Sequence, residues 1–159
     1  MNIRTKTELD SLERKALLDL WNAEYPLRIN YTSLEAFEAY LSGLSEGTFY
    51  LLESDLGAIK GWASSFRREN ETWFALIIAK ELHGQGYGTE LLNHLKQNNR
   101  ELSGWVIDGH QEVKSNGELY VSPQNFYLKQ NFKLLPEVRL EIPTLSAVKI
   151  YWKRSLEVE

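Results

Sequence analysis

Apolar residues recur at helical spacing in two stretches of the first third of the chain. The first stretch runs from about Thr7, a predicted helix cap, to Ala23. The second begins at Thr32, where a T-x-x-E pattern that ends at Glu35 predicts a capping box. Each stretch gathers its apolar side chains on one face, so we expect two amphipathic helices that cover a sheet.

A different pattern, apolar runs bounded by turn residues, predicts strands in the middle and at the end of the chain. Residues 48–53 and 58–66 each form one run, and residues 73–79 are apolar on both faces, as in a central strand covered from both sides. A helix is predicted after Pro123, because the fixed φ of proline suits a first helical turn. The remaining predicted strands are 105–108, 133–141 and 147–153, the last two joined around Pro143. The predicted fold class is α+β, a mixed, mostly antiparallel twisted sheet flanked by helices, with one strand–loop–helix unit at its centre.

The residues from Thr72 to Leu95 carry the strongest chemical signal. The apolar run is followed by Gly84, Gly86 and Gly88, and then by leucines at helical spacing. Amide N–H groups at the start of a helix lack an internal partner, and the helix dipole favours negative charge there. Glycines also let a ligand approach the backbone closely. This strand, loop and helix therefore predict a site for a phosphate-bearing ligand.

Two common phosphate-binding patterns fit this loop poorly. A Walker A loop that begins at Gly84 requires Gly-Lys at positions where the chain has Thr89 and Glu90, so that pattern is excluded. A dinucleotide fingerprint from Gly84 requires glycine or alanine in place of Thr89. Asp108 does follow at about the 20-residue spacing of a ribose-binding acid, so an NAD-dependent enzyme stays open as an alternative.

A third pattern fits best. Residues 83–88, His-Gly-Gln-Gly-Tyr-Gly, resemble the Q/R-x-x-G-x-G/A pyrophosphate loop of the GNAT family of N-acetyltransferases. Residues 126–132 resemble that family's F-Y-x-x-x-G-F segment, and the resemblance covers nearly the whole chain, with the elements in the expected order. His83 replaces the usual Gln or Arg, and Asn131 replaces a glycine where left-handed backbone is expected. The asparagine that usually precedes F-Y is not recognisable, and the polar stretch 110–118 lies in its neighbourhood.

The resemblance implies acetyl-CoA as co-substrate and direct transfer of its acetyl group to a primary amine in a ternary complex. It implies that the backbone of Leu76, Ile77 and Ile78 pairs with the pantetheine arm, while backbone amides of the loop hold the pyrophosphate. The implied loop residues are His83, Gly84, Gln85, Gly86, Tyr87, Gly88 and Thr89. An alternative of another class is a module of the same fold that binds acyl-CoA without transferring the acyl group.

Two residues are candidates for proton transfer. Tyr127 matches the family's general acid for the CoA thiolate, and a phenol and a thiol have pKa values close enough for this exchange. Its alternative is a tyrosine that packs a helix face. Glu71, at the start of the central strand, is the candidate base, with a solvated strand end as the alternative. Asp108, His110 or an ordered water are further candidates for the base.

The acceptor itself is not named by the sequence, and both a small-molecule amine and a protein amine stay open. Four aromatic residues are candidates either for the acceptor wall or for the core: Trp21, Tyr25, Tyr31 and Trp62. Arg67 and Arg68 either meet an acidic acceptor or form a solvated hairpin turn. His94 has no partner at a spacing that suggests a metal, so no metal site is predicted.

Composition narrows the function further. The chain has 159 residues, which predicts a single domain over 1–159, and its formal net charge of −4 argues against nucleic-acid and anionic-membrane partners. It contains no cysteine, which excludes disulfides and a thiol nucleophile. The first residues lack the apolar core of a signal peptide, so a cytoplasmic protein is expected. The oligomeric state stays open, a homodimer included.

Overall fold

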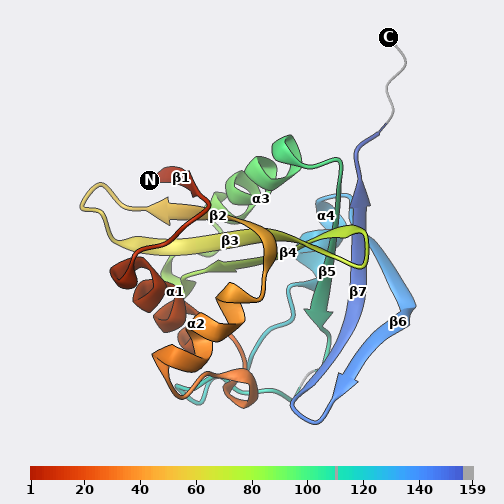
Figure 1. Ribbon diagram of the computed structural model, residues 1–159. Coiled ribbons are helices and arrows are strands. Elements are labelled where there is room, and N and C mark those ends of the chain that lie inside the picture. Colours follow the sequence, from red (N-terminus) through yellow and green to blue (C-terminus); the bar gives the residue numbers. More distant parts are fainter. Residues whose placement is uncertain (110, 156–159) are drawn as a thin grey trace.

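The computed structural model describes residues 1–109 and 111–155, which form a seven-stranded sheet in the order β1-β2-β3-β4-β5-β7-β6 (Figure 1). Neighbouring strands are antiparallel except β4 and β5, which run parallel. This mixed, mostly antiparallel sheet confirms the predicted fold class. The strands are β1 (Asn2–Lys6), β2 (Ser45–Glu53), β3 (Ile59–Arg68), β4 (Glu71–Ile78), β5 (Glu101–Ile107), β6 (Lys133–Ile142) and β7 (Leu145–Lys153).

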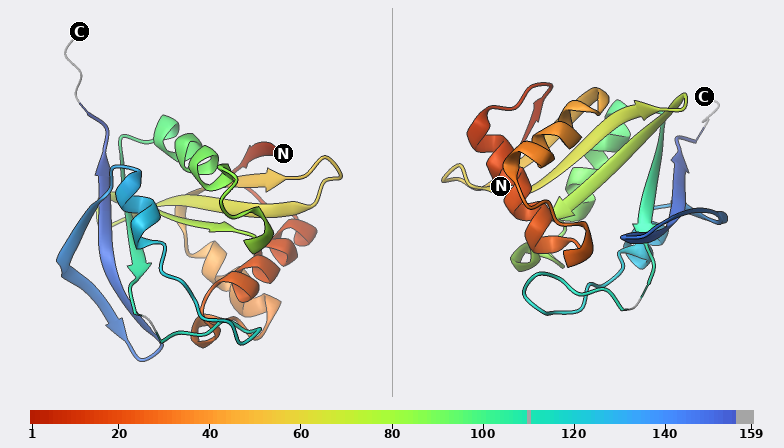
Figure 2. Two further views of the ribbon diagram at one scale, coloured as in Figure 1. Left: turned by 180° about the vertical axis from the view of Figure 1, so that it is seen from behind. Right: turned by 60° about the horizontal axis from the view of Figure 1, so that its bottom comes forward.

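Helices cover both faces of the sheet (Figure 2). One face carries the two N-terminal helices, and the other carries the helix after the glycines and a short helix near residue 127. The α-helices are α1 (Ser11–Glu24), α2 (Leu34–Ser42), α3 (Tyr87–Asn98) and α4 (Gln124–Lys129), with 3-10 turns η1 (Leu27–Ile29) and η2 (Lys80–Leu82). The predicted strand–loop–helix unit is therefore β4, the loop that begins with η2, and α3.

Both N-terminal helices begin later than the sequence predicted. Asp10, and not Thr7, caps α1: its Oδ1 accepts from Glu13 N at 2.8 Å and Glu13 Oε1 accepts from Asp10 N at 2.8 Å. β1 pairs with β2 up to Lys6, and residues 7–10 connect it to α1. Ser33, and not Thr32, caps α2 through a hydrogen bond from Ala36 N to its Oγ of 3.1 Å.

β4 divides the core between the two faces of the sheet. Trp73 and Ile77 pack with α1 and α2, whereas Phe74 and Ile78 pack with α3 and α4. All four side chains are buried. Alternate residues of a strand point to opposite faces, so a strand that is apolar throughout must be covered on both. The prediction of a central strand covered on both sides is confirmed.

The sheet opens between its two parallel strands. Among the residues described, β4 and β5 pair at a single position, Trp73 with Ser103, and the strands then diverge (Figure 2, right). Beyond this point Ala75 and Leu76 stay partly exposed although β4 lies in the middle of the sheet. The outer edge of β4 thus presents backbone groups that β5 does not pair.

Candidate active site

The loop between β4 and α3 depends on two glycines with left-handed backbone. Gly84 has φ of 77° and Gly86 has φ of 87°, a region that side chains with a Cβ resist. No atom lies within 4 Å of the place where a Cβ would stand on either residue. The loop is therefore both conformationally specific and open to a ligand.

The start of α3 lacks any side-chain cap. Gly86 is its N-cap residue, and no side chain accepts from the first turn. The amides of Tyr87, Gly88 and Thr89 are the first-turn donors that a helix leaves without an internal acceptor. With the positive end of the helix dipole behind them, these donors suit an anionic ligand such as a pyrophosphate. The residues present therefore fit the phosphate end of coenzyme A.

Side chains of the loop shape its backbone. The His83 ring nitrogen Nε2 lies 2.9 Å from Ile78 O, and Gln85 Nε2 donates to Glu81 O at 2.9 Å. Both contacts tie the loop to the residues just before it. The histidine that replaces the usual Gln or Arg at position 83 therefore has a structural role, because its ring contacts the last residue of β4.

Gly88 and Thr89 link α3 to α4. A Cβ on Gly88 would stand 3.3 Å from Phe126 Cζ, so the missing side chain lets the ring of Phe126 lie against the helix. Thr89 Oγ1 accepts from Gln130 Nε2 at 3.0 Å. The third glycine thus has a packing role that its position in the motif did not reveal.

Tyr127 lies on α4 in an aromatic cluster with Phe74, Phe126 and Phe132, at ring-centre distances of 5.6, 5.0 and 5.3 Å. It is buried, and burial, followed by the nearby Tyr120 phenol, raises the pKa of its hydroxyl. A phenol is protonated at neutral pH with or without this shift, and the higher pKa makes the Tyr127 hydroxyl a weaker acid, further from the pKa of a thiol. Its hydroxyl has no hydrogen-bond partner among the described residues. Asn131, in the same segment, has φ of 69°, which confirms the predicted left-handed position.

The segment 111–122, which we call the strap, overlaps the polar stretch 110–118, for which the sequence predicted no contacts. It runs from the end of β5 to the C-terminus of α1 and returns to α4 (Figure 2). Leu27 N donates to Val113 O at 2.7 Å, and Lys114 Nζ pairs with Glu24 Oε1 at 3.1 Å with both side chains largely buried. Composition gave no signal for these anchors, because they depend on where α1 ends in space.

The strap also brings Tyr120 towards the site. Burial raises the pKa of Tyr120, and burial together with the neighbouring Tyr120, Tyr40 and Tyr127 phenols raises the pKa of Tyr25. The hydroxyls of Tyr25, Tyr120 and Tyr127 have no hydrogen-bond partner among the described residues. Three phenols, from the end of α1, the strap and α4, therefore lie in one neighbourhood. Tyr127 was predicted as the general acid and Tyr25 as a candidate for the acceptor wall or the core, whereas Tyr120 was not predicted.

Glu71 lies in a tight ionic contact. Its two carboxylate oxygens each accept from Lys149 Nζ at 3.0 Å, and Oε2 also accepts from Ser103 Oγ at 3.1 Å. The contact joins β4, β5 and β7 beside the point where the sheet opens. Asp108, a candidate both for a ribose contact and for the base, instead pairs with Arg139 through two hydrogen bonds of 2.9 and 3.0 Å. His110 lies outside the described residues.

With this geometry in place, the comparisons with known proteins identify the family. The family model for the acetyltransferase (GNAT) domain matches residues 45–134, more than half of the chain. The chain belongs to the GNAT family. It is an acetyl-CoA-dependent acyltransferase with acetyl-CoA as co-substrate. No protein in the comparison with curated proteins matches the chain.

Three solved structures show the same fold as this GNAT protein. An aminoglycoside 6'-N-acetyltransferase complexed with coenzyme A has a TM-score of 0.73 at 14% identity, with 100% of both chains covered. A ribosomal-protein-alanine N-acetyltransferase from Brucella melitensis has 0.66 at 19%, covering 96% of this chain and 99% of the other. A phosphinothricin acetyltransferase from Sinorhizobium meliloti, in complex with AcCoA, has 0.64 at 12%, covering 97% and 89%.

On the α1/α2 face of the GNAT sheet, the predicted acceptor-wall residues divide into two groups. Trp21 and Trp62 are buried in the core, and Trp21 Nε1 donates to Ile29 O at 2.8 Å. Tyr25 and Tyr31 keep partial exposure near the α1–α2 connection. Sequence reasoning missed Trp105, whose ring centre lies 5.1 Å from that of Trp73 on the same face.

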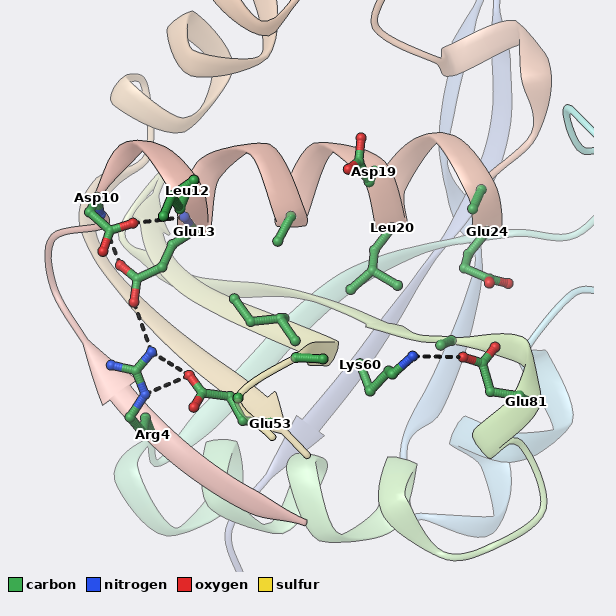
Figure 3. Close-up of a pocket in the computed structure, with 16 residues that line it drawn as sticks. Arg4, Asp10, Leu12, Glu13, Asp19, Leu20, Glu24, Glu53, Lys60 and Glu81 are labelled. Atoms are coloured by element: carbon green, nitrogen blue, oxygen red, sulfur yellow. Dashed lines mark hydrogen bonds and ion pairs between the residues drawn. The ribbon is translucent and has the colours of Figure 1, made fainter. Parts of the chain in front are cut away.

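A groove of about 640 Å³ lies elsewhere, between α1 and the β2–β3 hairpin (Figure 3). Apolar side chains such as Leu20 point into it, and its charged residues pair with one another: Arg4 with Glu13 and Glu53, and Lys60 with Glu81 at 3.3 Å. None of the predicted site residues lines it. The groove is therefore separate from the opening beside β4.

Within 1–109 and 111–155, no group of three or more His, Asp or Glu side chains is arranged to hold a metal ion. No helix among them is long and apolar enough to cross a membrane.

Proposed function

We propose that this GNAT protein transfers the acetyl group of acetyl-CoA directly to a primary amine within a ternary complex. The observation that carries the proposal is the adjacency of two backbone features, the unpaired edge of β4 and the uncapped start of α3. The first suits the amide-bearing pantetheine arm, and the second suits the pyrophosphate. Both lie on one continuous stretch, so one extended ligand can contact both.

The proposed roles follow from this placement. Leu76, Ile77 and Ile78 would pair with the pantetheine arm in strand fashion, and an N–H of this edge would polarise the thioester carbonyl. The amine then attacks the carbonyl carbon, the carbon–sulfur bond breaks, and the Tyr127 hydroxyl gives its proton to the departing thiolate. Amides of residues 84–89 hold the pyrophosphate throughout, whereas the His83 amide, predicted to take part, already donates to Lys80 O at 3.0 Å.

Glu71 is the proposed base, acting directly or through a water on the attacking amine. Both of its oxygens contact Lys149, and one also contacts Ser103, so accepting a proton requires one of these contacts to loosen. If the contacts instead hold the carboxylate in place, the proton leaves through ordered water. These alternatives predict a different pH dependence of the reaction rate for a Glu71 variant.

An amine panel tests the proposal. Wild-type protein is incubated with acetyl-CoA and amines of different classes, and release of the CoA thiol is measured. We expect release with at least one amine and a fall of about 10²- to 10⁴-fold in kcat for Tyr127→Phe, because the variant cannot donate the proton. Acetyl-CoA binding with no thiol release from any amine would contradict transfer and would assign the alternative, an acyl-CoA-binding module. A protein that binds no acetyl-CoA in calorimetry would contradict both.

A further inference from the structure

Arg68 lies on the acceptor face with its hydrogen-bonding edge unused. Its guanidinium carbon is 5.1 Å from the ring centre of Phe66 and 5.8 Å from that of Trp73. At these distances the guanidinium makes cation–π contacts with both rings, and such contacts do not use its N–H groups as hydrogen-bond donors. Arg68 is exposed and makes no hydrogen bond or ion pair with any described residue.

Its neighbour Arg67 provides the contrast. Arg67 stands at the same strand end and is equally exposed, but successive residues of a strand point to opposite faces. Its Nη1 donates to Thr72 Oγ1 at 2.9 Å. The solvated-turn interpretation therefore describes Arg67, whereas Arg68 is held against the rings of the acceptor face.

A second cation lies on the same tryptophan. Lys149 Nζ is 5.1 Å from the Trp73 ring centre, and its charge is paired with Glu71. Glu71, which lies opposite Arg68 in the β3–β4 register, is thus already paired, and Arg68 forms no ion pair with a described residue. The Trp73 indole N–H is buried and has no hydrogen-bond acceptor among the described residues, so it is not accessible to a ligand. At this ring the Arg68 guanidinium is the exposed donor without a hydrogen bond to a described residue.

The position of this ring relates Arg68 to the reaction centre. Trp73 and Ala75 point to the same face of β4, two residues apart, which corresponds to about 7 Å along a strand. Ala75 is partly exposed at the opening beside β4, where the acetyl group would lie. An acceptor whose amine reaches this opening can therefore place a second group against the Arg68 edge.

The other side of the opening is crossed by a contact that limits size. Arg28, in η1, donates from Nη2 to Pro143 O at 2.6 Å in the β6–β7 turn, and it approaches Glu112 of the strap at 3.6 Å. Three segments that border the acceptor face are thereby joined. A compact acceptor fits this arrangement better than a folded protein surface.

We propose that the acceptor is a small primary amine that carries an anionic group, of the carboxylate type, and that Arg68 binds this group. The proposal rests on the proposed acetyl transfer and names its substrate class. A guanidinium binds a carboxylate through two parallel hydrogen bonds, which gives orientation as well as affinity. The same cations repel a polycationic amine, so they select against that class.

The test compares Arg68→Gln with Arg67→Gln in the complete chain. Free amino acids, their carboxamides, a diamine and a short peptide are assayed for thiol release from acetyl-CoA. We expect wild-type protein to prefer amino acids over their carboxamides, and Arg68→Gln to reduce kcat/KM for amino acids by about 10- to 100-fold, as for loss of a charged hydrogen-bonded pair. Carboxamide turnover should stay unchanged, and Arg67→Gln should resemble wild type.

An equilibrium measurement separates this proposal from the proposed function. Calorimetry with free amino acids, and with CoA in place of acetyl-CoA, should show binding to wild-type protein that Arg68→Gln loses, whether or not turnover occurs. Arg68→Glu should weaken amino-acid binding further and favour the diamine. Equal use of amino acids and carboxamides by wild-type protein, or equal responses of the two arginine variants, would overturn the proposal. Thiol release with other amines would then leave the transferase function intact.

Discussion

The cofactor side and the acceptor side of β4 are built from different groups. On the proposed cofactor side, the groups proposed to face the ligand are backbone atoms from one continuous stretch, the edge of β4 and the first turn of α3. On the proposed acceptor side, they are side chains from separate elements, among them Tyr25, Arg68, Trp105 and Lys149. The two sides meet at the point where β4 and β5 part.

This difference explains how one fold can serve several acceptors. A cradle of backbone groups requires only glycines at two left-handed positions and a strand that ends before the loop. Its geometry therefore changes little when side chains are substituted. A side-chain wall can be altered residue by residue without disturbing the cradle. Substitutions on one side should therefore leave the other side intact, and each prediction below tests that separation.

The largest expected effect is on the stability of the fold, at the start of α1, a helix of the proposed acceptor side. Burial alone would raise the pKa of Glu13, but hydrogen bonds from Lys6, the Asp10 amide and Arg4 outweigh it and lower the pKa from 4.5 to about 2. A lowered pKa stabilises the fold above pH 4.5, and this contribution is lost as the pH falls towards 2. Glu13→Gln should reduce the free energy of unfolding by about 2–3 kcal/mol at pH 7.

Urea unfolding from pH 7 down to pH 3 measures this. The difference between Glu13→Gln and wild type should shrink below pH 4.5, while acetyl-CoA affinity of the folded variant stays unchanged at pH 7. A stability difference that is constant over the whole range would contradict the assignment to the Glu13 charge.

The next largest effect is on the cofactor side. Gly86→Val places a branched Cβ at φ of 87° in the open cradle, which costs about 1–3 kcal/mol and intrudes on the space of the anion. Acetyl-CoA affinity measured by calorimetry should fall by about 10- to 100-fold. Gly57→Val is the matched control, since Gly57 has φ of 84° and equally open surroundings but lies in the β2–β3 turn. Equal affinity losses in the two variants would argue against a direct role for the cradle.

A smaller effect is expected when the strap is released. Lys114→Met removes the ion pair with Glu24, so the strap should loosen and residues 111–120 should exchange their amide hydrogens faster. KM for the amine should rise severalfold, about 1 kcal/mol of binding, without a change in acetyl-CoA affinity. Lys80→Met, which removes the exposed ion pair with Glu118, serves as the control and should have little effect. A change in cofactor affinity for Lys114→Met would show that the two sides are coupled.

The smallest difference separates the two roles of Glu71. If Glu71 is the base, Glu71→Gln should lower kcat at every pH and remove the acidic limb of the pH–rate profile. If it only joins β4 to β7 through Lys149, the limb should remain and kcat should fall less than about tenfold, with a matching loss for Lys149→Met. Rates of both variants between pH 5.5 and pH 9 distinguish the outcomes.

The sequence predicted the strand, loop and helix of the proposed cofactor side well, because these elements depend on local sequence. Each motif predicts the structure of its own few residues. These motifs are the apolar run before Gly84, the helical leucines after Gly88 and the segment around Tyr127. The left-handed backbone at Asn131 was also predictable, because few residue types tolerate it. The caps of α1 and α2 were missed by three residues and by one residue, because Thr7 and Thr32 are also good cap residues, whereas Asp10 and Ser33 make the capping hydrogen bonds.

The acceptor side was poorly predicted because it is assembled over long distances. The pairs Lys114–Glu24, Glu71–Lys149 and Arg28–Pro143 join residues that no sequence pattern relates. Arg67 and Arg68 were indistinguishable until the strand register assigned them to opposite faces. The residue type at such positions indicates the charge of the side chain. The direction in which the side chain points, and the residue that it contacts, are known only from the fold.

The single paired position between β4 and β5 also bears on the lifetime of the protein. It leaves the sheet as two parts, β1 to β4 and β5 to β6, which a ligand lying in the opening would contact together. Binding to the folded state alone stabilises it by mass action, by about 2.7 kcal/mol at a ligand concentration one hundred times Kd. The fraction of chains exposed to proteolysis would then fall by about 100-fold. Bound acetyl-CoA would thus protect the folded enzyme from proteolysis.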